Sequence, residues 1–470
     1  MEYQEAIEYH NLLKRLKRCT RGTKWKKSVA AYWLNRLLNT RHLRREILSG
    51  RYRISKYLWF IITEPKRRDI YASHIKDRQY QHALIDDIVY PAVTRTFIAA
   101  NCACQQDKGT KFCVDIFLAQ LREFARIHGN NAYALQCDIK GYFPNSNHDI
   151  VSRNTAQYVD PYTARACEDV IRSFAEIEFT KILMATGAEK RDAHNAGHRI
   201  SSYLIYGGDW KRVVKGLSSS QIAAVTERIR QGDFKGVGLG SQVTQITQIA
   251  LLNDMDHYIT EMLGIQVYAR YMDDFILAHE SKKYLGFCRD KITEFLAQKK
   301  LTLNPKTQLY PLSRGIILLH WRIRVGVTGK VVIHKHRSNI RKERRKLRKQ
   351  KKLLDAGKIS MTAIENSFQC WQAGILQQKC YMQVIQLRRL FYQLFNRRAP
   401  EWNAKRRELK RRDKVIISSM PTHIQMECCV DGMRPQYKRG TKKRRLQLPA
   451  NIATICWTVV TICWYRIDLT

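Results

Sequence analysis

Two adjacent carboxylates, Asp273 and Asp274, interrupt the apolar stretch of residues 267–277 (Val-Tyr-Ala-Arg-Tyr-Met-Asp-Asp-Phe-Ile-Leu). Neighbouring carboxylates repel one another, so a fold keeps such a pair mainly where a cation compensates the charge. Mg²⁺ prefers carboxylate oxygen and accepts phosphate as a further ligand. The pattern predicts a β-hairpin that carries both aspartates at its tip. An isolated Asp-Asp pair, however, is most often an ordinary surface turn.

A third carboxylate, Asp138, follows an apolar segment earlier in the chain. Residues 132–138 have the composition of a strand, and residues 144–148 indicate a turn into a helix. If the two strand ends lie side by side, the three carboxylates can ligate two metal ions about 4 Å apart. Two such ions activate an attacking 3′-hydroxyl and hold a triphosphate, so catalysis is mostly positioning and charge neutralisation. Without the pair at 273–274, Asp138 would be an ordinary helix N-cap or loop aspartate.

Five sequence motifs follow one another between residues 55 and 325. They are residues 64–70 with Asp77-Arg78, residues 101–110, Asp138, residues 236–245, and Tyr271-Met-Asp-Asp274. In this order they resemble the motifs of bacterial reverse transcriptases, in the branch that includes diversity-generating retroelements, retrons and group II introns. The resemblance implies an α+β fold of the right-hand polymerase type. Its parts would be fingers, a palm built on a mixed or antiparallel sheet, and a helical thumb.

The resemblance also assigns roles at the chemical centre. Asp138, Asp273 and Asp274 would be the catalytic aspartates and would hold two Mg²⁺ ions, or Mn²⁺ in their place. Ile139, the residue after Asp138, would belong to the same metal site. Lys306 matches the lysine that protonates the departing pyrophosphate in this family.

Further positions are implied to contact nucleotide or template. They are Lys66, Arg68, Phe143, Gly240, Gln245 and Tyr271. Lys66 and Arg68 would contact the triphosphate, unless they form an ordinary basic surface turn. Phe143 would lie under the sugar and select deoxynucleotides by excluding a 2′-hydroxyl, unless it is a core phenylalanine. Gly240 would let the backbone approach the template closely.

Several positions depart from the pattern of the family. Gly238 stands where proline is usual, which predicts a looser but intact loop. Leu239 replaces the glutamine of high-fidelity members, as in the error-prone diversity-generating enzymes. His320 occupies a position where glycine is common in the primer-grip hairpin. The long separation of the palm motifs predicts an insertion near residues 183–233.

The composition independently indicates a polyanionic partner. The chain has 83 Lys and Arg against 41 Asp and Glu, a net charge of +42, which implies strongly salt-dependent binding to nucleic acid. With 470 residues, 44% of them hydrophobic, it is long enough for two or three domains. The 13 cysteines follow no zinc-ligand spacing, so we interpret them as reduced thiols of a cytoplasmic protein. The N-terminal residues lack the apolar core of a secretory signal.

The expected domains follow from these motifs and from the charge pattern. They are a helical N-terminal segment (1–54), fingers (55–130), palm (131–325, with the insertion at 183–233), a helical basic thumb (330–398) and a basic tail (399–470). Within the thumb, residues 337–352 include ten basic residues and one acidic residue. On a helix this charge excludes a core location and favours contact with nucleic-acid phosphates; a nuclear-localisation signal or a solvated helix is the alternative. The apolar segment 452–465 is too short to span a bilayer, so no membrane partner is expected.

The combined reading is an RNA-directed DNA polymerase that extends an RNA or DNA primer with dNTPs on an RNA template. In a diversity-generating system its partners would include a structured noncoding RNA and a small basic accessory protein, in the cytoplasm of a bacterium or as a phage-encoded protein. A phage-defence reverse transcriptase would have the same chemistry. An RNA-copying RNA polymerase is disfavoured by Phe143, and a non-catalytic RNA-binding scaffold is disfavoured because all three carboxylates are present.

Overall fold

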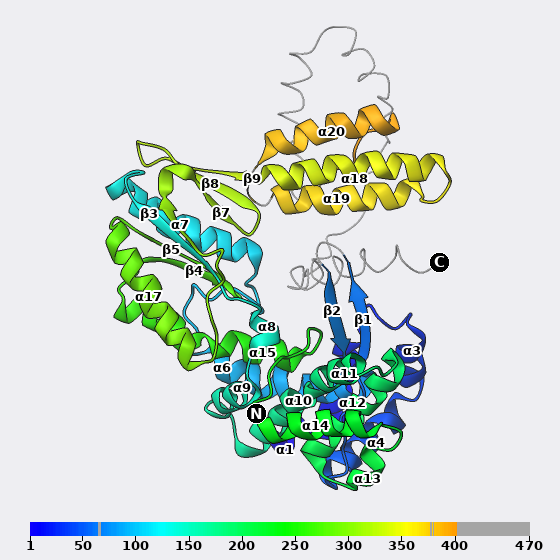
Figure 1. Ribbon diagram of the computed structural model, residues 1–470. Helices are drawn as coiled ribbons and strands as arrows, with labels where there is room; N and C mark the ends of the chain where they lie inside the picture. Colours follow the sequence, from blue (N-terminus) through cyan, green and yellow to red (C-terminus); the bar gives the residue numbers. More distant parts are fainter. Residues whose placement is uncertain (64–66, 377, 379, 402–470) are drawn as a thin grey trace, which may run out of the picture. The chain divides into compact units, whose positions relative to one another are not determined.

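The computed structural model describes residues 1–63, 67–376, 378 and 380–401. It is a mixture of helices and small antiparallel sheets (Figure 1) and divides into two compact units, Met1–Leu312 and Ser313–Thr470. Lys66 and nearly all of the predicted tail lie outside the described residues. Within the described ranges, no helix has the length and apolar character needed to cross a bilayer.

The first unit is rich in helices. Its helices are α1 (Tyr3–Ala6), α2 (Tyr9–Cys19), α3 (Lys27–Leu34), α4 (Arg36–Leu48), α5 (Ile75–Leu84), α6 (Tyr90–Thr94), α7 (Thr110–His128), α8 (Tyr142–Asn145), α9 (His148–Ala156), α10 (Pro161–Ser173), α11 (Ala175–Ala185), α12 (Lys190–Tyr206), α13 (Trp210–Val213), α14 (Ser219–Gln231), α15 (Gln242–Leu251), α16 (Asn253–His257) and α17 (Lys282–Gln298), with π-helical turns η1 (Ile85–Val89) and η2 (Tyr258–Met262). Its strands are β1 (Leu58–Ile62), β2 (Arg68–Ala72), β3 (Tyr133–Asp138), β4 (Val267–Tyr271), β5 (Asp274–His279) and β6 (Gln308–Pro311).

The central sheet has the strand order β4–β5–β3–β6, and every neighbouring pair is antiparallel. Helix α17 packs against β3 and β5, and α7 packs against β4 (Figure 1). Because helices cover the sheet, consecutive residues of β5 from Phe275 to Ala278 are all buried. This explains the uninterrupted apolar runs on both sides of the Asp-Asp pair. The antiparallel sheet predicted from the sequence is confirmed, and the division into fingers, palm and thumb remains a prediction.

The N-terminal helices pack on α5. Helix α2 contacts α4 and α5, and Leu12 and Leu16 on its inner face are fully buried. Arg15 lies on the same face and forms a buried ion pair with Asp87 of η1. Its Nε donates a hydrogen bond to Asp87 Oδ2 at 2.8 Å. Each charge of the pair compensates the other, so neither is left buried without a partner, which would be strongly destabilising.

The predicted insertion at 183–233 is occupied by helices that have a core of their own. That core contains Ala175, Phe179, Leu183, Ala193, Ala196, Ile200 and Val225. Helices α11 and α12 approach closely at Gly197, where a Cβ would lie 2.9 Å from the carbonyl oxygen of Glu176. Lys190 of α12 lies over the ring of Trp59 in β1, 4.1 Å from the ring centroid. The insertion therefore packs against the β1–β2 hairpin.

The second unit combines a small sheet with three helices. It contains β7 (Ile316–Leu318), β8 (Trp321–Val325), β9 (Val331–Lys335), α18 (Arg337–Asp355), α19 (Met361–Leu376) and α20 (Tyr381–Phe395), with a 3₁₀ turn, η3 (Leu312–Arg314), at the division between the units. The three helices contact one another. The charge pattern predicted that no part of α18 would be buried in a core, and the structure contradicts this prediction for one face of the helix. One stripe of the helix is buried, formed by Ile340, Glu343, Leu347 and Gln350, because these positions recur at helical spacing on a single face.

Candidate active site

Two of the three aspartates lie opposite one another where the two inner strands of the central sheet, β3 and β5, end. Strand β3 pairs with β5 in a register that places Asp138 opposite Asp274. Strand β5 pairs with β4 so that Asp274 faces Tyr271, which leaves Met272 and Asp273 as a two-residue turn. Met272 has a φ of 61°, in the left-handed region that tight hairpins use. The hairpin expected from the sequence therefore forms, with Asp274 as the first residue of its second strand.

The three carboxylates interact electrostatically. Partial burial, followed by the charges of Asp273 and Asp138, raises the pKa of Asp274 from 3.8 to about 6. An all-carboxylate donor set suits a hard divalent cation such as Mg²⁺, and a cation would remove the repulsion. Within the described residues, no three His, Cys, Asp or Glu side chains are already gathered into a metal-binding arrangement. The donor chemistry therefore fits Mg²⁺, whereas the side chains are not drawn together around one point.

Asn304 connects Asp138 to the turn that carries Lys306. Its side-chain Nδ2 donates to Asp138 Oδ2 at 2.6 Å, and its backbone N–H donates to the Asp138 carbonyl at 2.7 Å. Its side-chain oxygen accepts a hydrogen bond from the backbone N–H of Lys306 at 3.1 Å. The Lys306 side chain itself is exposed. Sequence reasoning missed Asn304, although the Asn-Pro dipeptide at 304–305 was a usable turn signal.

The glycine-rich segment 236–240 crosses between β2 and α8. The N–H of Val237 donates to the carbonyl of Phe143 at 2.9 Å, and the N–H of Tyr71 donates to a carbonyl of the segment at 3.1 Å. At Gly240 φ is 123°, and a Cβ would lie 3.0 Å from the Tyr71 carbonyl oxygen. Only glycine fits there. The segment thus ties the β1–β2 hairpin to the helix that follows Asp138.

Gly238 has a packing role that differs from the loosening predicted from the sequence. A Cβ at this position would lie 2.5 Å from Cε1 of Phe174. Phe174 is fully buried and stacks on Tyr57 with ring centroids 4.7 Å apart. The space that a side chain at position 238 would occupy is therefore filled by the ring of Phe174, which packs tightly against the segment.

Gly238→Ala is expected to destabilise the first unit by about 1–3 kcal/mol, because a methyl group would overpack a full site. The change should appear as a lower denaturant midpoint at an unchanged slope. Gly286→Ala in α17 is the matched control, because nothing lies within 4 Å of its Cβ position and alanine favours a helix. A midpoint for Gly238→Ala equal to that of the wild type would contradict the packing role.

The remaining predicted positions lie as follows. Phe143, Gln245 and Tyr271 are half-buried, Arg68 is exposed at the start of β2, and Lys66 lies outside the described residues. The Ile139 side chain is 1% exposed and apolar, so only its carbonyl oxygen could serve as a metal ligand. The structure therefore brings Asp138, Asp274 and the neighbouring turn together, with Asn304 beside them.

Arg270 is a further residue of this region that sequence reasoning missed. It lies in β4, its side chain is 0% exposed, and it forms an ion pair with the equally buried Asp256 at 2.5 Å. The usable signal was a charged residue inside an otherwise apolar strand, since such residues are almost never fully buried unless they are paired.

The departure at His320 does not prevent a hairpin in the second unit. Leu318 pairs with Trp321, so Leu319 and His320 form a two-residue turn between β7 and β8. Their φ angles are 46° and 67°, the left-handed values for which glycine or asparagine is usual. The His320 carbonyl accepts a hydrogen bond from the His336 N–H at 2.9 Å, which ties the turn to the start of α18.

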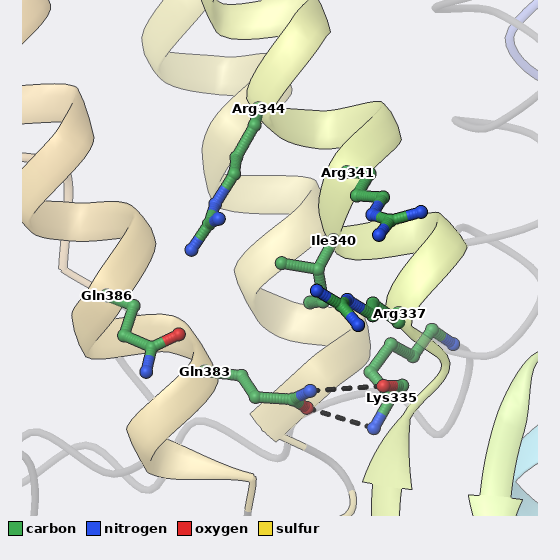
Figure 2. A pocket seen from close by; sticks show the side chains of 7 residues that line it. All are labelled: Lys335, Arg337, Ile340, Arg341, Arg344, Gln383 and Gln386. Carbon is green, nitrogen blue, oxygen red and sulfur yellow. Dashed lines mark hydrogen bonds between the residues drawn. The ribbon is translucent and has the colours of Figure 1, made fainter.

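A basic cavity of about 240 Å³ lies between α18 and α20 (Figure 2). It is lined by Lys335, Arg337, Ile340, Arg341, Arg344, Gln383 and Gln386. Gln383 fixes one wall, because its Oε1 accepts from the Lys335 N–H at 2.9 Å and its Nε2 donates to the Lys335 carbonyl at 3.0 Å. Burial lowers the pKa of the Lys335 amine to about 8. Four basic side chains around one cavity provide charged donors suited to phosphate oxygens.

Comparisons with known proteins find similarity only to solved structures, at low sequence identity. No protein-family model matches the chain, and no curated protein matches it. Among solved structures, the chain is similar to apo telomerase from Candida tropicalis (12% identity, 60% of this chain and 48% of that chain, TM-score 0.34) and to the same telomerase truncated from its C-terminal domain (12%, 63% and 60%, 0.33). It is also similar to telomerase from Candida albicans in complex with a fragment of telomeric RNA (11%, 86% and 71%, 0.38). At these identities and TM-scores the similarity carries no argument, and the chain spans about half to three-fifths of the length of the first two.

Proposed function

We propose that this chain is an RNA-directed DNA polymerase that extends a primer 3′-hydroxyl with dNTPs. The observation that carries the proposal is the pairing of Asp138 with Asp274 beside the turn that contains Asp273. The raised pKa of Asp274 supports it, because burial and then the charges of Asp273 and Asp138 raise this pKa, and a divalent cation would offset that repulsion. The net charge of +42 supports a nucleic-acid partner.

In this proposal Asp138, Asp273 and Asp274 hold two Mg²⁺ ions, with the carbonyl oxygen of Ile139 as a further ligand. Bound metal would supply charge neutralisation at the triphosphate and activation of the primer hydroxyl. The chain's own contribution is to hold the carboxylates at fixed positions. Asn304 does this for Asp138, because its hydrogen bond to Oδ2 orients the carboxylate and leaves Oδ1 available.

The substrate would be held by residues around the strand ends that carry Asp138 and Asp274. Phe143 would exclude a 2′-hydroxyl from the sugar site, and its backbone is fixed by the segment 236–240. Lys306 would give a proton to the departing pyrophosphate, from a turn that Asn304 fastens to Asp138. Arg68, together with Lys66, would contact the triphosphate.

Primer extension on an RNA template tests the proposal. The purified chain is incubated with Mg²⁺ and a labelled primer, and dNTPs and rNTPs are supplied in separate reactions. DNA synthesis that requires Mg²⁺ is the expected result. Extension with rNTPs at a comparable rate would instead identify an RNA polymerase. No extension with either set, on several RNA templates and with RNA recovered from the producing cell, would contradict the proposal and favour an RNA-binding scaffold.

The biological setting is the finer part of the proposal. We place the enzyme in the cytoplasm, in a retroelement such as a diversity-generating system, with a structured RNA and a small basic accessory protein as partners. The DNA recovered from the protein in cells tests this setting. Copies of a template repeat with substitutions at adenines are expected, whereas DNA unrelated to any repeat would favour phage defence.

The proposal also predicts a pH dependence. Because Asp274 takes up a proton below pH about 6, the Mg²⁺ concentration for half-maximal synthesis should rise about tenfold per pH unit below that value. Without metal, the folded chain holds this proton to a higher pH than the unfolded chain, so stability should fall as the pH rises from 3.8 to about 6. Mg²⁺ titrations at several pH values, with melting curves in a chelator, check both trends. A Mg²⁺ requirement that is constant between pH 5 and pH 7 would contradict the first trend, and a melting temperature in chelator that does not fall as the pH rises to about 6 would contradict the second.

A further inference from the structure

We infer that Arg270 is a positioning residue that fixes the turn carrying Asp273, an inference that rests on the proposed function. Its guanidinium is fully buried, and its Nη1 donates a hydrogen bond to the carbonyl oxygen of Met272 at 3.0 Å. Met272 is the first residue of the two-residue turn and Asp273 is the second. The guanidinium therefore holds the peptide that joins them.

The guanidinium is itself held from two other elements. Its Nε and Nη2 donate to the two carboxylate oxygens of Asp256 in α16, at 2.6 and 2.5 Å. The same Nη2 donates to the Ile249 carbonyl of α15 at 3.1 Å. Asp256 also accepts a hydrogen bond from the Tyr268 hydroxyl at 2.7 Å. A planar guanidinium with this many fixed partners has little freedom to move. It therefore fixes the position of the turn relative to α15 and α16.

The backbone of Arg270 makes a second connection. Its N–H donates to the Ala100 carbonyl at 2.9 Å, and its carbonyl accepts from the Cys102 N–H at 3.0 Å. The segment 101–110, one of the motifs seen in the sequence, thus lies against the strand that leads to Asp273. Cys104 of that segment contacts Met272, with the two sulfur atoms 3.9 Å apart.

The turn needs such support because of its own conformation. Met272 is a non-glycine residue at positive φ, and surrounding contacts must hold a residue in that region. If Arg270 served only to form a structural ion pair, its contact with Asp256 would be enough. Arg270 in addition donates to the turn that presents Asp273, and this contact is what a purely structural role would not require.

Two variants separate positioning from stability. Asp256→Asn weakens the ion pair but leaves the guanidinium bonded to Met272. Arg270→Met with Asp256→Asn removes both buried charges, keeps an acceptor for the Tyr268 hydroxyl and loses the bond to the turn. Replacing a buried pair by apolar or neutral groups is often tolerated, whereas removing one partner is strongly destabilising. The double variant is therefore expected to fold.

The probe is Mn²⁺ alone, titrated into the full chain and followed by electron paramagnetic resonance. We expect the double variant to bind Mn²⁺ about 10–100-fold more weakly, the usual effect of losing a residue that orients metal ligands. Asp256→Asn should lower the melting temperature but keep the Mn²⁺ affinity within about threefold. If the double variant fails to fold, Arg270→Lys replaces it, because lysine keeps the charge but cannot reach Asp256 and Met272 together.

A control uses another buried pair of the first unit, Arg15 and Asp87. Arg15 also pairs with Asp86, which keeps Arg18 and His82 as partners in the variant. Arg15→Met with Asp87→Asn removes the same two charges and should leave Mn²⁺ affinity unchanged. Wild-type Mn²⁺ affinity in the Arg270 double variant or in Arg270→Lys would overturn the inference. A wild-type chain that binds Mn²⁺ and depends on Arg270 for it, but makes no DNA, would refute the proposed function alone. A wild-type chain that binds no Mn²⁺ would refute both.

Discussion

Asp274→Asn is expected to abolish primer extension and to leave the protein no less stable. We expect the rate to fall at least about a thousand-fold, the scale of losing a main electrostatic stabiliser of the transition state, because asparagine keeps the shape of the side chain and removes its charge. In a chelator at pH 8 the melting temperature should be equal to or above that of the wild type. The reason is that Asp274 is ionised at this pH although partial burial, and then the charges of Asp273 and Asp138, raise its pKa to about 6.

The loss of activity without a loss of melting temperature makes the prediction specific. A substitution that damaged the fold would lower both activity and melting temperature, so loss of activity alone would be ambiguous. Asp290→Asn in α17 serves as the control, since its side chain is 63% exposed and pairs with the adjacent Arg289. It should change neither quantity. More than a tenth of the wild-type rate in Asp274→Asn would exclude this carboxylate from the reaction.

Neutralising the basic cavity of the second unit should weaken the salt dependence of nucleic-acid binding. If Arg337, Arg341 and Arg344 each contact one phosphate, their replacement by glutamine should reduce the slope of log K against log salt by about 2 to 3. A primer–template duplex is titrated at several salt concentrations with each protein. Affinity should fall for all sequences alike, because phosphate contacts carry no sequence information.

The control changes the same net charge on the same helix. Lys342, Lys346 and Lys349 lie on another face of α18 and outside the residues that line the cavity, and their replacement by glutamine should alter the slope by less than 1. Equal effects of the two triple variants would mean that only the total charge of α18 matters. The cavity would then have no special part in binding, which would contradict the prediction.

The sequence predicted the local structure around the carboxylates better than their tertiary environment. An apolar strand that ends in Asp138 and an apolar hairpin around Asp273 are local patterns, and both form. The register that places Asp138 opposite Asp274 is not local, because it depends on how β3 and β5 are packed between helices. The electrostatic coupling of the carboxylates could be expected only once that register was assumed.

Two residues near the site could not have been assigned by pattern alone. Asn304 stands in a recognisable turn, but its hydrogen bond to Asp138 joins positions 166 residues apart. Arg270 interrupts an apolar strand, and its partner Asp256 lies on a different element. Periodicity assigns charged residues to exposed faces, so it fails where a buried partner satisfies the charge. The buried stripe of α18 was missed for a related reason, since ten basic residues obscured the helical spacing of a few inward positions.

The packing of Gly238 against Phe174 has a consequence for how this sequence can diverge. A ring carbon of Phe174 lies where any Cβ at position 238 would have to be, so the two positions share one volume. A descendant could acquire a proline at position 238 only after residue 174 had become smaller. A smaller residue at 174 alone would leave a cavity, which is also destabilising. Homologues should therefore show the two positions changing together. Glycine at position 238 should occur with an aromatic residue at 174, and a larger residue at 238 should occur with a smaller residue at 174.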